Sequence, residues 1–269
     1  FMPRFGFAFK LNEKTVVRSG YGMFFAYMEN MGDSEHLIGN PPFAFGVTLA
    51  GSNTAPAVLL ASGPPPGSTD LTRATGLQFS SFERNPKMSV AHQWNFNIQR
   101  ELGADWLFEI GYSGSRGLHL VRQYEANFSP AGPGAVNNKR IYSRVAIPGT
   151  SVIASPLGNT YSHRYDGNSI YHAMLAKVEK RFSSGFTLLA SYTFSKTIGD
   201  TCGTAVQGNI GGCGYQNILN MSPERSLDNQ DIPHRFVTSA LYDLPVGKGR
   251  TFLGTAHPVA EAVLGGWSI

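Results

Sequence analysis

The sequence predicts an all-β fold, an antiparallel sheet that forms part of the wall of a transmembrane β-barrel. Three observations predict it. Apolar and polar residues alternate with a period of two in seven segments, which places successive side chains on opposite faces of a strand. The connections between these segments alternate between short and long. Charged residues make up only 15% of the chain, yet its mean hydropathy is −0.14, as expected for a wall with one lipid face and one aqueous face.

The predicted hairpin over residues 171–196 gives the clearest sign of a lipid face. One face of its return strand carries Phe186, Leu188, Ala190, Tyr192 and Phe194, with aromatic rings at the ends and small aliphatic side chains between. Aromatic rings favour the two membrane interfaces, so this order is typical of a strand that crosses a bilayer. We assign seven residues to the interface belts: Trp94, Trp106, Tyr112, Phe186, Tyr192, Phe194 and Tyr242.

Seven segments show the strand pattern, in chain order: 4–10, 15–25, 92–99, 106–113, 171–182, 186–196 and 234–244. The first six form three hairpins, whose turns fall at 11–14, 103–105 and 183–185. Residues 265–269 resemble the start of an eighth strand. Because antiparallel neighbours return at alternating ends, all three tight turns lie on one side of the sheet.

The connections on the other side are long and rich in Pro and Gly: 26–87, about 123–169 and 197–233. The first contains one small strand candidate at 43–49, and the intermediate connection 245–265 contains a candidate helix at 258–264. Connections this long argue against a compact soluble domain. They are expected of an outer-membrane barrel, which has short periplasmic turns and long extracellular loops. Alternation alone still leaves a soluble all-β domain open.

The positions of the charges fit the same facing. Glu109, Lys177 and Glu179 fall on the polar face, whereas Arg100, Lys180 and Lys196 fall on the apolar face near strand ends, where long side chains reach the interface. The net charge of +4 is scattered without a block of like sign, so we expect no nucleic-acid partner.

The two cysteines, Cys202 and Cys213, lie close together in a Gly-rich stretch. We expect a disulfide, which would imply an oxidising compartment and contribute about 3 kcal/mol; two free thiols are the alternative.

Prolines interrupt the uncharged stretch 37–69, so the sequence predicts no transmembrane helix. We expect a fragment cut at both ends, because it begins Phe1-Met2-Pro3 without a signal peptide and stops in a strand pattern.

No catalytic constellation is present in the sequence. Residues 111–115 lack the closing Gly of a nucleophile elbow, residues 247–251 lack the spacing of a phosphate loop, and the seven His residues are dispersed. We therefore expect no enzymatic activity, no cofactor and no metal site.

Two polar groups lie in the long connections. The first is a loop-root cluster that would contact substrate or gate the barrel mouth, or would only hold the loop by ion pairs: Glu224, Arg225, Asp228, Asp231, His234 and Arg235. The second comprises Tyr161, His163, Tyr165 and Tyr171, which would stack on a sugar or aromatic ligand, or would only pack the loop.

Six motifs follow one another in an order that is specific as a set: PRFGFA (3–8), RSGYGMF (18–24), QWNFNIQREL (93–102), VEKRF (178–182), ASYTFSK (190–196) and PHRFV (233–237). Together they resemble the barrel of Oar-like TonB-dependent outer-membrane receptors, whose members typically carry a carboxypeptidase-regulatory-like domain at the N-terminus. The resemblance covers nearly the whole chain. Residues 1–269 would then be a partial barrel domain, without the plug and the N-terminal domain.

The resemblance implies a barrel of about 22 strands with a plugged lumen, of which this piece would be about a third. It also implies a place in the outer membrane of a Gram-negative bacterium, with outer-membrane lipid, TonB and a nutrient as partners. The nutrient would be an oligosaccharide, a peptide or a metal chelate. Two alternatives remain: an adhesion or secretion-linked scaffold without import, and a soluble carbohydrate-binding β-domain.

Overall fold

The computed structural model describes most of the predicted strands and only part of the long connections. The described residues are 1–25, 40, 52, 54, 61, 63, 79–142, 145–146, 149, 151, 153–154, 157–201, 215–254, 259, 263 and 266–269.

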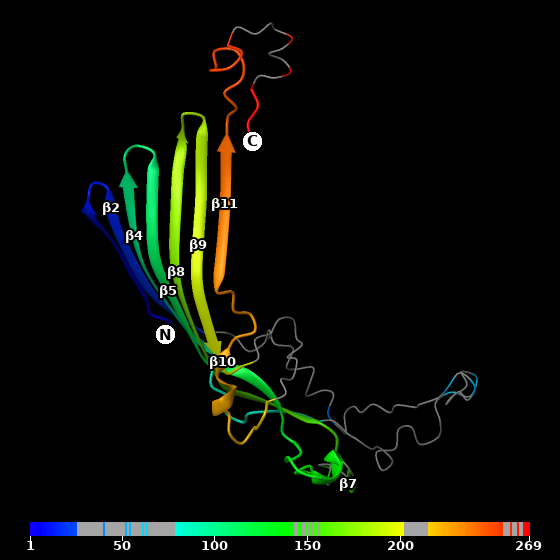
Figure 1. Cartoon of the computed structure of the whole chain (residues 1–269). Coiled ribbons are helices and arrows are strands. Elements are labelled where there is room, and N and C mark those ends of the chain that lie inside the picture. Colours follow the sequence, from blue (N-terminus) through cyan, green and yellow to red (C-terminus); the bar gives the residue numbers. More distant parts are fainter. Residues whose placement is uncertain are drawn as a thin grey trace.

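Seven long strands lie side by side in one antiparallel sheet (Figure 1). In spatial order they are β1 (Arg4–Asn12), β2 (Thr15–Phe25), β4 (Val90–Leu102), β5 (Trp106–Glu125), β8 (Thr160–Ser183), β9 (Phe186–Gly199) and β11 (His234–Tyr242). The sheet therefore confirms the seven predicted strands, and each pairs with its sequence neighbours as a meander. At the end of the sheet, Tyr242 N donates to Ile269 O at 2.7 Å, so the predicted eighth strand begins to pair there.

The turns and the long connections lie at opposite ends of the sheet. Figure 1 shows the tight turns of β1–β2, β4–β5 and β8–β9 together at the top, and the starts of β4, β8 and β11, which follow the long connections, at the bottom. Ser184 and Gly185 both have positive φ, 53° and 75°, as the two central residues of a type I′ hairpin turn require. Their backbone twist matches that of the flanking strands, which is why this hairpin can close in two residues.

One face of the sheet is apolar from edge to edge. The register places Ile98 opposite Ile110, Ile110 opposite Ala176, Ala176 opposite Tyr192, and Tyr192 opposite Phe236. Directly opposed residues share a face, so the apolar sets of the separate strands form one continuous surface.

This surface is not covered by a second layer among the described residues. Ile110 is 54% exposed and Phe236 67% exposed, and the only described apolar residues that are buried are Val90, Leu157, Tyr165 and Ala173. A soluble sandwich would bury such a face in a core. The exposed apolar face is instead that of a sheet whose solvent on one side is lipid.

Two predictions about the connections are wrong. Residues 160–169, predicted as loop, belong to β8, which is 24 residues long and pairs with a β5 of 20 residues. A membrane strand needs only about 9–11 residues, so both strands continue beyond the bilayer. Residues 79–82, also predicted as loop, form β3 (Phe79–Phe82), which pairs in parallel with β8. Outside lipid, neither segment has to present one apolar face, so neither shows the alternation.

A β-bulge marks the point where β5 leaves the membrane segment. The register shifts between Leu118 and Leu120, where His119 has a φ of 55°. Ser89 Oγ donates to His119 O at 2.6 Å. Bulges re-aim side chains, and beyond this one β5 turns polar and charged groups into a buried cluster.

The remaining described elements are short. They are η4 (Val136–Lys139), β6 (Val145–Ala146), β7 (Ile153–Ala154), η5 (Ser222–Glu224) and β10 (Ser226–Leu227). The predicted strand at 43–49 lies outside the described residues. Of the predicted helix at 258–264, Val259 and Val263 are described, both with helical backbone. None of the described helical segments has the length and hydropathy of a membrane-spanning helix.

Candidate functional site

The residues assigned to the belts lie in two bands on the apolar face. Trp94, Tyr112, Tyr192 and Phe194 lie toward the long connections, and Trp106, Phe186 and Tyr242 lie toward the tight turns. On β9 the bands are eight residues apart, about 27 Å along the strand and about 20 Å along the axis of a barrel with strands tilted by about 40°. That spacing is comparable to the apolar band of outer-membrane barrels, about 25 Å.

Tyr–His pairs recur in the band next to the long connections. Tyr21 Oη lies 2.6 Å from His92 Nδ1, Tyr112 Oη lies 2.6 Å from His172 Nδ1, and Tyr192 Oη lies 2.7 Å from His234 Nδ1. Each pair joins two strands that a long connection links: β2 with β4, β5 with β8, and β9 with β11. A hydroxyl on a lipid-facing surface needs a partner, and here the neighbouring strand supplies it.

Gly114 makes room for the indole of Trp94 in the same band. The two residues are directly opposed on β5 and β4, and a Cβ at Gly114 would lie 2.3 Å from Trp94 Cε2. The indole therefore lies across the neighbouring strand, where its Nε1 donates to Tyr112 Oη at 3.4 Å.

Lys180, in the band next to the tight turns, is hydrogen-bonded by its own turn. Lys180 Nζ donates to Ser183 O at 3.0 Å, to Ser183 Oγ at 2.8 Å and to Phe186 O at 3.1 Å. The ammonium group thus reaches the turn rather than lipid, as long basic side chains do near an interface.

The opposite face of the sheet carries rows of polar side chains across the strands. In one row Gln99 is opposite Glu109, Glu109 is opposite Lys177, and Lys177 is opposite Ser191. Lys177 Nζ also lies 3.0 Å from Glu179 Oε2. In a barrel this face lines the lumen, so it offers a passing solute an array of hydrogen-bond donors and acceptors.

A buried ion-pair cluster fixes the ends of β5 and β8 beyond the membrane segment. The guanidinium of Arg122 lies 2.9 Å from Asp166 Oδ1 and 3.9 Å from Asp200 Oδ2, and its side chain is only 6% exposed. Asp200 also accepts the backbone N–H of Asn168 at 2.6 Å. Sequence analysis missed this cluster because its three charged residues are far apart in the sequence and no pattern links them.

Asn127, which is fully buried, fixes the connection that follows β5. Its Nδ2 donates to Gly158 O at 3.0 Å, and its Oδ1 accepts Tyr142 N–H at 2.7 Å. Arg140 Nη1 donates to Asn127 O at 2.6 Å and lies 3.4 Å from Glu125 Oε2. The root of this connection is therefore held by specific polar contacts.

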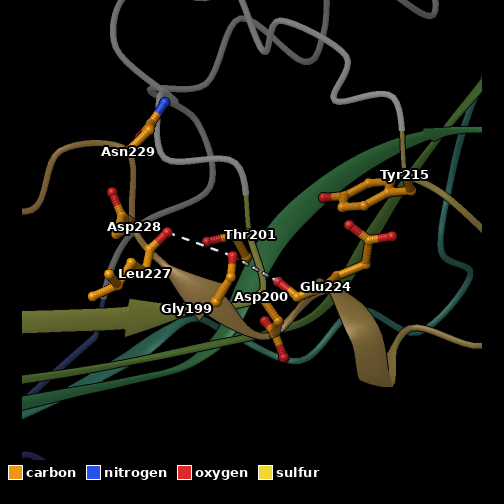
Figure 2. Close-up of a pocket in the computed structure, with 9 residues that line it drawn as sticks. Gly199, Asp200, Thr201, Tyr215, Glu224, Leu227, Asp228 and Asn229 are labelled. Atoms are coloured by element: carbon orange, nitrogen blue, oxygen red, sulfur yellow. Dashed lines mark hydrogen bonds between the residues drawn. The ribbon is translucent and has the colours of Figure 1, made fainter.

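A pocket of about 160 Å³ lies at the end of β9, beside β10 and η5. In the view of Figure 2, the strand end Gly199–Thr201 lies between Tyr215 and Glu224 on one side and Leu227 and Asp228 on the other. The complete lining is Gly199, Asp200, Thr201, Tyr215, Glu224, Ser226, Leu227, Asp228 and Asn229. Three of these residues are acidic and none is Lys or Arg, so the pocket favours groups that donate hydrogen bonds or carry positive charge.

The structure divides the predicted loop-root cluster. Glu224 and Asp228 line the pocket, and Asp231 Oδ1 accepts Thr197 N–H at 2.6 Å, which fixes the connection to β9. Arg225 is exposed beside η5. His234 lies on the apolar face against Tyr192, and Arg235 lies on the polar face opposite Thr193, so these two point away from each other.

Two of the aromatic residues considered for ligand stacking are not accessible to a ligand. His163 is fully buried and stacks on Phe82 with ring centroids 4.6 Å apart, and Tyr165 is 2% exposed. The ring of His163 packs β3 against β8. The predicted disulfide between Cys202 and Cys213 lies outside the described residues and stays a prediction.

In the described part of the chain, no group of three His, Cys, Asp or Glu residues is arranged to hold a metal ion. The sheet thus has one apolar face and one polar face. At the end with the long connections, specific polar contacts hold the starts of those connections, and an acidic pocket lies there.

Comparison with known proteins gives a family for the whole chain. The model of an outer membrane beta barrel domain family matches residues 1–269. No curated protein matches the sequence.

Among the solved structures that are similar to the chain are the following two. One is the structure of the FpvAI–pyocin S2 complex, with 9% identity and a TM-score of 0.42. The other is the ferripyoverdine receptor of the outer membrane of Pseudomonas aeruginosa bound to ferripyoverdine, with 10% identity and a TM-score of 0.42. Each match covers 90% of this chain and 20% of the other, so the chain spans about a fifth of their length.

Proposed function

The chain belongs to the outer membrane beta barrel domain family, and from that premise we propose that it forms part of the wall of a TonB-dependent receptor that imports a nutrient. Family membership places the chain in the outer membrane of a Gram-negative bacterium and sets aside the soluble carbohydrate-binding domain. The Oar-like subfamily, the plug, the roughly 22-strand barrel and the dependence on TonB belong to the proposal. They are supported by the six ordered sequence motifs.

One observation carries the proposal: among the described residues, the acidic pocket and the polar contacts that hold the roots of the long connections lie at one end of the sheet. The acidic pocket and the buried Arg122 cluster lie at the end with the long connections, and the polar face leads from there toward the tight turns. In an outer-membrane barrel the long connections are extracellular. Ligand arriving from outside would therefore meet the pocket first and the lumen face second.

The residues suggest how each step works. Carboxylates of Glu224 and Asp228 would accept hydrogen bonds from hydroxyl or ammonium groups of an oligosaccharide, a peptide or a metal chelate. Energy delivered through TonB would then move the plug, and the ligand would exchange hydrogen bonds along the polar face, for example at Gln99, Glu109 and Ser191. Binding and passage need no bond to be made or broken, which supports a receptor or transporter rather than an enzyme.

An adhesion or secretion-linked scaffold is the second candidate. The feature that favours it is the ribbon of β5 and β8, which extends beyond the length a membrane needs. A ribbon that projects from the membrane could bind a macromolecular partner, and such binding would not require import.

Uptake in cells that carry the full-length gene tests the proposal. Accumulation of labelled oligosaccharide, peptide and ferric chelate is compared in cells with and without the gene, each with and without TonB. We expect one class to accumulate only when both are present. The double variant Glu224→Gln/Asp228→Asn keeps the acceptor oxygens that bind Gln216 N–H and Gln230 N–H but removes two charges, so we expect weaker uptake with normal assembly.

Glu13→Gln, in the exposed β1–β2 turn, is the matched control and leaves uptake unchanged. If no class accumulates although the receptor is folded in the outer membrane, import is refuted. Altered attachment of the cells to a surface or a partner would then favour the scaffold.

A further inference from the structure

Basic side chains form a row across the lipid face at the edge next to the long connections. Five neighbouring strands contribute one each: His92, Arg116, His172, Lys196 and His234, which we call the basic row. His92 is opposite Arg116, and His172 is opposite Lys196. His234 is opposite Phe194, one alternate position from Lys196. The row spans four strand spacings, about 19 Å, and all of its members except the half-buried His92 are exposed.

The Tyr–His pairs orient the histidines of the row outward. Tyr112 Oη accepts a hydrogen bond from Trp94 Nε1 at 3.4 Å and lies 2.6 Å from His172 Nδ1. On a lipid face the hydroxyl hydrogen needs an acceptor, and Nδ1 is the one at hand. In the neutral imidazole the ring N–H hydrogen then lies on Nε2. The charged imidazolium also carries a hydrogen on Nε2. Each pair therefore presents an N–H donor away from its tyrosine.

The charges of the row have no counterpart within the described part of the chain. Arg116 and Lys196 form no ion pair there, and the described strands carry no Asp or Glu on this face at the level of the row. Asp200, further along β9, is already engaged by Asn168 N–H and lies 3.9 Å from Arg122. At the opposite edge of the same face, Lys180 donates hydrogen bonds to its own turn, and Arg100 is the other Lys or Arg that the described strands place there. The row next to the long connections is therefore the larger group of basic side chains on the described part of this face.

We propose that the basic row is a binding site for the phosphate groups of the phosphorylated glycolipid that forms the outer leaflet. Three observations carry this inference: the row lies just beyond an aromatic belt, at the depth of headgroups; it lies on the side of the long extracellular connections; and its guanidinium, ammonium and N–H donors match phosphate oxygens. The site faces lipid rather than the lumen, so it is independent of the transport proposed above.

Lipid retention by the full-length protein tests the site. The protein is purified in a non-ionic detergent and exposed to three probes: lipid A with both phosphates, the same lipid A after dephosphorylation, and phosphatidylglycerol. Bound lipid is counted by native mass spectrometry. We expect lipid A with both phosphates to bind at least about tenfold more tightly than the dephosphorylated form, since hydrogen bonds between charged groups are lost. We also expect it to exceed phosphatidylglycerol.

The double variant Arg116→Gln/Lys196→Gln loses about tenfold or more of the affinity for phosphorylated lipid A. Arg100→Gln is the matched control, because it removes a cation from the same face at the opposite interface, and it leaves the affinity unchanged. Folding of each variant is checked by the mobility shift between boiled and unboiled samples.

Equal retention of the phosphorylated and dephosphorylated probes would overturn the site, and this comparison needs only the unmodified protein. Equal binding of phosphatidylglycerol would overturn the assignment to glycolipid. An equal loss in the double variant and in Arg100→Gln would show a general effect of charge, and it too would refute the proposal.

Discussion

Replacing Ala190 with Lys tests the facing of the sheet most directly. Ala190 lies on β9 four residues from Phe186 and four from Phe194, midway between the two aromatic bands. Its neighbours on the same face are Val178 and Thr238, and neither carries a negative charge that could form an ion pair with an ammonium group. A lysine at the midplane of a barrel's lipid face costs about 2–4 kcal/mol, which corresponds to a roughly 30- to 700-fold shift in the folding equilibrium.

Ser191→Lys is the matched control, one residue along the same strand and on the opposite face. Its neighbour Lys177 has like charge, which costs about 0.2–1 kcal/mol, but Lys177 is already paired with Glu179 at 3.0 Å. The expected difference between the two variants is therefore at least about 1 kcal/mol and at most about 4 kcal/mol.

The assay measures how much full-length protein reaches the outer membrane in folded form, by membrane fractionation and by the gel shift between boiled and unboiled samples. Ala190→Lys should reduce this fraction strongly, and Ser191→Lys should leave it near the unmodified level. Equal assembly of the two variants, or the reverse order, would refute the assignment of the apolar face to lipid.

Two further substitutions test contacts at the end of the sheet with the long connections. Gly114→Leu should displace the Trp94 indole and lower stability by about 1–3 kcal/mol, seen as a shift in tryptophan emission and in the urea midpoint. Gly20→Ala, whose Cβ would meet its nearest atom at 3.4 Å, should cost less. Arg122→Ala should cost about 1–3 kcal/mol, since it removes the buried guanidinium that pairs with Asp166 and Asp200 and donates to Asp166 O, and hydrogen exchange should rise at the outer ends of β5 and β8. Arg164→Ala, at a pair with both side chains about half exposed, should cost under about 1 kcal/mol; equal exchange in the two Arg variants would contradict the role of the buried cluster.

The membrane segments were predictable because lipid on one side and water on the other leave little freedom. Each strand must alternate, so β2 was predicted with its observed ends, 15–25. Lys180 also behaves as predicted, since its ammonium group reaches the turn. The same physics explains where prediction fails. Beyond the interface both faces of β8 meet water or protein, so residues 160–169 carry no alternation although the backbone ladder with β5 continues.

The candidate site was only partly predictable, because it depends on register rather than on pattern. Glu224 and Asp228 were predicted as neighbours from sequence proximity and do line one pocket, whereas His234, equally close in sequence, lies on the lipid face. Strand parity could have separated them, since His234 is two residues before Phe236 on the same face. Asp200, which also lines the pocket, could not be placed there without knowing how far β9 extends.

The Tyr–His pairs follow a regular pattern that can be recognised only when the strand register is known. In each pair the tyrosine lies on a strand that leads into a long connection, and the histidine lies on the strand that returns from it: Tyr21 with His92, Tyr112 with His172, and Tyr192 with His234. The sequence separations differ widely, 71, 60 and 42 residues, so no fixed motif reveals them. The constant is geometric, because each histidine lies one alternate position from the residue opposite its tyrosine. A contact that recurs at every described crossing despite such different connections is imposed by the interface itself: the tyrosine hydroxyl must be satisfied at the edge of lipid, and the returning strand is the nearest source of an acceptor.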